Sequence, residues 1–85
     1  MAKYRNPWKT LAEVHKNNHY LALKYLSLSP VYWFTTATIG IELNDLPPDE
    51  TYRVLLALYS NGWIEYRDSD CWRITPLGVK QLARL

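Results

Sequence analysis

The stretch from Leu55 to Gly78 dictates the order of secondary structure in this 85-residue chain, and it reads LLALYSNGWIEYRDSDCWRITPLG. Leu55 and Leu58 have helical spacing, and Asn61-Gly62 marks the end of this helix, because glycine accepts the left-handed conformation that closes a last helical turn. Two short segments rich in aromatic and β-branched residues, 63–67 and 71–75, then flank a polar turn. This order predicts a helix, a β-hairpin and a second helix.

A three-residue turn, Asp68-Ser69-Asp70, determines which residues of the predicted hairpin lie opposite each other. With Ser69 at its centre, apolar residues face apolar residues on one side of the hairpin, and an acid faces a base on the other. The expected pairs are Ile64 with Ile74, Tyr66 with Trp72, and Glu65 with Arg73.

The helix after the hairpin has a clear start signal. Thr75 is a good N-cap. Pro76 suits the first helical position because a backbone N–H there has no partner within the helix, so proline loses no hydrogen bond. Helical spacing then predicts that Val79, Leu82 and Leu85 form its buried stripe.

These motifs resemble the end of the winged-helix DNA-binding domains of prokaryotic regulators. In that family a leucine-bearing recognition helix, "GLIE", a wing and "LTPKG" commonly follow one another, and here Leu-x-x-Leu, GWIE, the hairpin and ITPLG do so. Trp63 stands in place of leucine, and Leu77 stands where lysine is frequent. The resemblance implies an α+β fold, a small winged helix-turn-helix ordered helix, strand, helix, helix, strand, strand, helix. It implies sequence-specific DNA binding and transcriptional regulation, although winged helices also serve as protein-binding modules.

The residues ahead of this stretch supply the other elements of one domain spanning 1–85. Residues 1–6 are expected to be a flexible arm. Helical spacing from Trp8 to Leu28 predicts one long helix weakened at Asn17-Asn18, or two short helices. A short strand is expected at 31–34, and Thr35 or Thr36 can cap a helix at 37–43.

The next helix, at about 48–61, follows a turn at residues 44–47. Gly40 is expected to let it approach the preceding helix closely. Its inner face is predicted to hold Thr51, Leu55 and Leu58. Its outward face would then carry Tyr52, Arg53, Leu56, Tyr59 and Ser60.

The family resemblance implies that this outward face enters the major groove of double-stranded DNA. Arg53 can bind guanine or a phosphate there, and Tyr52, Tyr59 and Ser60 can hydrogen-bond to the backbone. We add Thr36, at the start of the second helix, and Arg67, in the wing, as DNA contacts. Residues 1–30 carry a net charge of +4, residues 31–60 carry −3 and the rest carry +1. Lys3, Arg5 and Lys9 are therefore expected to attract DNA without regard to sequence.

A second hypothesis is that the outward face of the same helix is a protein-contact surface. Asp49, Glu50, Asp68 and Asp70 would bring negative charge close to phosphates. Contiguous exposed apolar patches usually mark protein partners. Tyr52, Leu56 and Tyr59 would then form a homodimer or bind another protein.

Other chemistry is not indicated. His15 and His19 have the i, i+4 spacing of zinc ligands, but no third ligand lies nearby, so we expect exposed polar side chains rather than a metal site. We expect no cofactor and no catalytic activity, because the chain carries no phosphate loop, paired carboxylates or serine elbow. With a single cysteine, no secretory signal and no long apolar run, a cytoplasmic protein without a membrane span is expected.

Overall fold

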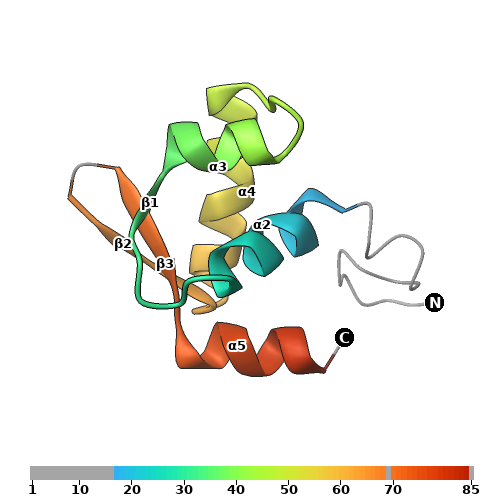
Figure 1. The fold of residues 1–85 in the computed structure, drawn as a ribbon, viewed down its shortest axis with the longest axis vertical. Coiled ribbons are helices and arrows are strands. Elements are labelled where there is room, and N and C mark those ends of the chain that lie inside the picture. Colours follow the sequence, from blue (N-terminus) through green and yellow to red (C-terminus); the bar gives the residue numbers. More distant parts are fainter. Residues whose placement is uncertain (1–16, 69, 85) are drawn as a thin grey trace.

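The computed structural model describes residues 17–68 and 70–84 of the chain. Within these ranges the protein is α+β, with four helices and one three-stranded antiparallel sheet (Figure 1). The elements, labelled as in Figure 1, are α2 (Asn18–Ser27), β1 (Phe34–Thr35), α3 (Thr36–Glu42), α4 (Pro48–Ser60), β2 (Ile64–Arg67), β3 (Cys71–Ile74) and α5 (Pro76–Ala83). Strand β3 lies between β1 and β2 in the sheet.

Helix α2 begins where the two asparagines interrupt the apolar pattern. Asn17 is its N-cap, and the side-chain oxygen of Asn17 accepts a hydrogen bond from the backbone N–H of His19 at 2.8 Å. Ala22, Leu23 and Leu26 are fully buried against the rest of the chain. A helix start at Asn18 agrees with the two-helix alternative. The expected arm at 1–6 and the expected helical residues up to 16 lie outside the described part.

The first strand is shorter and later than the sequence predicts. We expected 31–34, but Val31 and Tyr32 are exposed, and the N–H of Tyr32 donates to the carbonyl of Ser29 at 3.0 Å in a turn. Pro30 has no N–H to give to a sheet, which favours a turn at this point. Pairing begins only where Phe34 lies opposite Trp72.

Helices α3 and α4 approach closely at Gly40, as expected. A Cβ atom at this position would lie 2.8 Å from Thr51 Oγ1 and 2.9 Å from the carbonyl oxygen of Leu46. The turn between the helices reverses the chain through Asn44 and Asp45, whose φ angles are 63° and 58°. Asparagine and aspartate tolerate this left-handed conformation better than other non-glycine residues.

The predicted hairpin register is confirmed. Strands β2 and β3 pair Ile64 with Ile74, Glu65 with Arg73, Tyr66 with Trp72, and Arg67 with Cys71. On the outer face, Arg73 and Glu65 form an ion pair at 2.8 Å. Ser69, the centre of the predicted turn, lies outside the described residues.

Helix α5 begins as predicted but presents a different face to the core. Thr75 caps it by accepting a hydrogen bond from the N–H of Gly78 at 3.1 Å. Gly78 is buried with its Cα against the carbonyl of Trp63, so glycine is the residue that fits this contact. Leu82 packs against the core four residues later, whereas Val79 is exposed. The predicted stripe is therefore wrong at Val79, and Leu85 lies outside the described residues.

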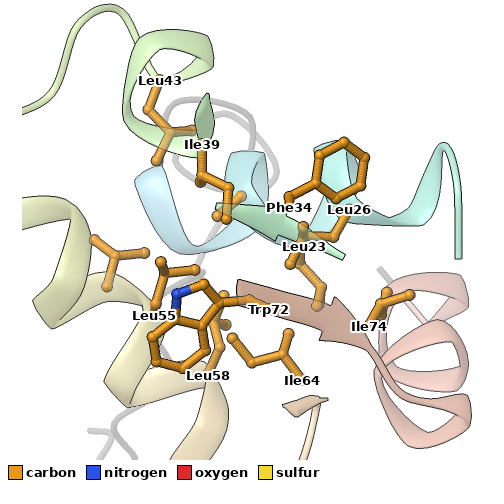
Figure 2. Close-up of a cluster of buried hydrophobic side chains, with 12 residues drawn as sticks. Leu23, Leu26, Phe34, Ile39, Leu43, Leu55, Leu58, Ile64, Trp72 and Ile74 are labelled. Carbon is orange, nitrogen blue, oxygen red and sulfur yellow. The ribbon is translucent and has the colours of Figure 1, made fainter. Parts of the chain in front are cut away.

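Trp72 lies at the centre of the core, where the indole ring is 1% exposed. Figure 2 shows Trp72 among Leu55, Leu58 and Ile64. The same cluster takes in side chains of α2 and α3, so sheet and helices share one interior. One face of α4 packs against this interior, and its other face is exposed.

Leu58→Ala should destabilise the protein by about 2–5 kcal/mol, because it leaves a cavity in a closely packed core. Leu56→Ala is the matched control on the same helix, since Leu56 is 39% exposed and its truncation should cost far less. Urea unfolding followed by circular dichroism measures both. Equal, small losses for the two variants would contradict the assignment of the buried face of α4.

Candidate nucleic-acid interface

Helix α4 separates into a buried stripe and an open face, as its sequence predicts. Thr51, Val54, Leu55 and Leu58 are buried. The hydroxyl of Thr51 donates to the carbonyls of Leu46 and Pro47, at 3.1 and 2.9 Å, which holds the helix start against the preceding turn. The open face carries the predicted residues: Tyr52, Arg53, Leu56, Tyr59 and Ser60.

The polar side chains of the open face differ in what they can offer a ligand. Arg53 is exposed and makes no hydrogen bond or ion pair with any residue in the described ranges. Its guanidinium donors can therefore bind a ligand. Ser60 donates its hydroxyl proton to the carbonyl of Leu56 at 2.9 Å. Its oxygen keeps lone pairs, so Ser60 can accept a hydrogen bond more easily than it can donate one.

Thr36 is not part of any exposed surface. It is 5% exposed, and its hydroxyl accepts a hydrogen bond from Trp72 Nε1 at 2.8 Å and donates to Asp70 Oδ1 at 2.7 Å. The N–H of Thr36 also donates to the carbonyl of Asp70 at 3.2 Å. Both functions of the hydroxyl are occupied, so Thr36 leaves the set of candidate DNA contacts. It connects α3 to the β2–β3 hairpin instead.

Arg67 lies on the outer face of the hairpin, away from the open face of α4. Its guanidinium carbon is 4.3 Å from the ring centroid of Trp33, and the guanidinium carbon of Arg73 lies at the same distance from that ring. Side chains alternate between the faces of a strand, so Arg67 and its neighbour Tyr66 point to opposite sides. The fold therefore does not gather Arg53 and Arg67 onto one flat surface.

The inner face of the hairpin and the open face of α4 together surround a small hollow. Tyr52, Leu56 and Tyr59 of α4 line it, with Tyr66 of β2 and Trp72 of β3, and its volume is about 170 Å³. We call these five residues the aromatic cage. The sequence predicted that Tyr66 faces Trp72 and that the α4 side chains share a face, but no local pattern relates the two groups.

Acidic residues flank this region at both ends of the described surface. Glu42, Asp45, Asp49 and Glu50 are exposed around the turn between α3 and α4, and Asp68 and Asp70 are exposed at the tip of the hairpin.

The described residues contain six lysines and arginines and seven aspartates and glutamates, a net charge of −1. The whole chain carries +2, so its positive excess comes from residues 1–16. The candidate contacts Lys3, Arg5 and Lys9 are among them and lie outside the described part.

Of the two histidines, only His19 lies in the described part of the chain, and it is half-buried. Its Nδ1 lies 3.0 Å from Asn17 Oδ1, and burial lowers the pKa of its imidazole. Within 17–68 and 70–84, no three histidine, cysteine or acidic side chains gather in a way that could hold a metal ion. The same ranges contain no helix with the length and apolar character needed to cross a bilayer.

Comparisons of the chain with protein-family models, with curated proteins and with solved structures gave no match.

Arg53→Gln and Arg53→Ala should each leave the free energy of unfolding within about 0.5 kcal/mol of the wild type, because Arg53 is exposed and has no partner among the described residues. Thermal unfolding of both variants measures this. A loss above 2 kcal/mol in either would mean that Arg53 has a structural role, and its use as a functional probe would fail.

Proposed function

We propose that this protein is a sequence-specific DNA-binding regulator with a winged helix-turn-helix fold. In this assignment α3 and α4 are the helix-turn-helix and the β2–β3 hairpin is the wing. The observation that carries the proposal is the open face of α4, which follows the turn at Asn44 and Asp45 and presents both an unengaged guanidinium and exposed tyrosine side chains. A helix with such a face is the element that reads base edges in helix-turn-helix proteins.

In the proposed complex α4 lies in the major groove and Arg53 binds a guanine or a phosphate. Tyr52 and Tyr59 donate hydrogen bonds to the backbone. Asp49 and Glu50 occupy the first turn of α4 and would repel phosphates. We therefore place the contacts along residues 52–60 rather than in the first turn of the helix. Lys3, Arg5 and Lys9 add attraction that is independent of base sequence and is weakened by salt.

Protein binding through α4 is a second candidate function, and one observation favours it. Tyr52, Leu56 and Tyr59 are 39–50% exposed and adjacent on one face. Side chains of this size at a surface are typical of a protein interface. A homodimer built on this face would cover the residues that the first proposal assigns to DNA.

A salt titration of affinity for duplex DNA tests the proposed function. Arg53→Gln should weaken binding to a selected site by about 1–3 kcal/mol and relax the preference at one base pair, if Arg53 reads a base. Lys9→Gln should weaken all duplexes alike and reduce the slope of log K against log salt by about one unit.

Two results together would replace the DNA proposal with the protein-contact one. The first is undetectable duplex binding at low salt. The second is that Leu56→Glu or Tyr59→Glu converts a stable oligomer into a monomer, as measured by light scattering under the same conditions.

A further inference from the structure

We propose that the aromatic cage binds the cationic end of a lysine or arginine side chain from a basic segment of a partner protein. This inference goes beyond DNA binding and does not depend on it. It rests on the arrangement of the rings, the size of the hollow and the charges beside it.

Three tyrosine rings surround the indole of Trp72 at steep angles. The ring centroids of Tyr52, Tyr59 and Tyr66 lie 5.9, 6.3 and 4.8 Å from that of Trp72, with interplanar angles of 67°, 77° and 57°. Trp72 is only 1% exposed beneath these rings, so the three tyrosines, which are 43–50% exposed, supply the accessible aromatic walls of the hollow, from α4 on one side and from β2 on the other. Aromatic faces carry the negative part of the ring quadrupole and attract cations.

The size of the hollow selects for a single side chain. Sites for whole small molecules usually measure about 300–1,000 Å³, whereas this hollow has about 170 Å³. An ammonium or guanidinium group with its last methylenes is small enough for it. The apolar stem of lysine or arginine would lie against Leu56, which also lines the hollow.

Charges next to the aromatic cage favour a basic partner over nucleic acid. No residue that lines the hollow is charged. Asp49 precedes Tyr52 by three residues on the same helix and therefore lies on the same face, and Asp68 follows Tyr66 by two residues at the hairpin tip. Both aspartates are exposed. Three cations adjoin cage residues in sequence. Arg67 and Arg73 lie over Trp33 on the outer face of the hairpin, and Arg53, about 100° around the helix from Tyr52, shares the open face of α4 with Leu56. A phosphate-bearing ligand would meet both acidic neighbours, whereas a basic segment would be attracted to them.

Tyr52 and Tyr59 belong both to the aromatic cage and to the proposed DNA-binding face. A basic segment bound there would cover part of the surface that α4 offers to a major groove. If both ligands bind, they should compete.

The test uses two probes that differ in charge but hardly in shape, N-acetyl-arginine amide and N-acetyl-citrulline amide, titrated into the full chain. The ring proton signals of Tyr52, Tyr59 and Tyr66 and the indole signals of Trp72 report binding by NMR. We expect saturable shifts with the arginine probe and at least fivefold weaker binding of the citrulline probe, since cation–π attraction requires the charge.

Paired substitutions separate the role of the ring from that of the hydroxyl. Tyr59→Phe keeps an aromatic wall and should change affinity for the arginine probe less than twofold, whereas Tyr59→Leu should weaken it about fivefold or more. Tyr66→Phe and Tyr66→Leu repeat the comparison from the hairpin side. A cooperative thermal unfolding transition establishes that each variant is folded.

The inference is overturned if the two probes bind equally, which would indicate an apolar hollow without preference for charge. It is also overturned if adenosine monophosphate shifts these rings and the arginine probe does not, or if no probe shifts them. Duplex binding is measured separately on the same samples. Tyr66 is not a proposed DNA contact, so Tyr66→Leu should weaken arginine binding and leave duplex binding intact, whereas Arg53→Gln should weaken duplex binding and leave arginine binding intact.

Discussion

The hydrogen bond from the indole N–H of Trp72 to the hydroxyl of Thr36 holds the hairpin to the helices. Trp72 is almost completely buried, and a buried N–H without a partner would cost about 1–3 kcal/mol. The Thr36 hydroxyl accepts this bond at 2.8 Å and donates a hydrogen bond to Asp70 Oδ1 at 2.7 Å. The strand that carries Trp72, the start of α3 and the tip of the hairpin are thereby joined at one hydroxyl. Because the same indole packs against α4 side chains, the position of the hairpin relative to α4 follows from it.

This constraint shapes both proposed activities. A hairpin held close to α4 creates the aromatic cage, and it leaves Arg53 on the outer side of the helix. Exposed aspartates lie near the cage, whereas the net positive charge of the chain comes from residues 1–16. DNA binding would therefore draw on those residues and on Arg53, while a basic protein segment would use the rings. The two partners would compete for Tyr52 and Tyr59.

Local rules predicted much of this fold. The polar turn around Ser69 gave the hairpin register, Thr75-Pro76 marked the last helix, and helical spacing separated the faces of α4. Each of these rests on residues close in sequence or on a simple alternation. Thr36 was misjudged because its partners lie 34 and 36 residues away. Val79 was wrongly predicted to be buried. The close contact between Gly78 and Trp63 turns the Gly78 side of α5 toward the core, and this contact depends on tertiary packing.

The aromatic cage was only half predictable for the same reason. Its helix side and its hairpin side each follow a recognisable period. Only the tertiary arrangement of α4 against the hairpin brings them within ring-contact distance. Sequence patterns describe each element separately, so a site that spans two elements requires their relative position.

A double-mutant cycle on Thr36 and Trp72 tests whether their hydrogen bond holds the hairpin to the helices. Thr36→Val removes the acceptor, and Trp72→Phe removes the donor but keeps an aromatic ring. Urea unfolding of the wild type, the two single variants and the double variant gives the coupling between the sites. We expect a favourable coupling free energy of about 0.5–3 kcal/mol, as found for residues in direct contact. Additive losses, with a coupling near zero, would contradict the claim that this bond holds the hairpin to the helices.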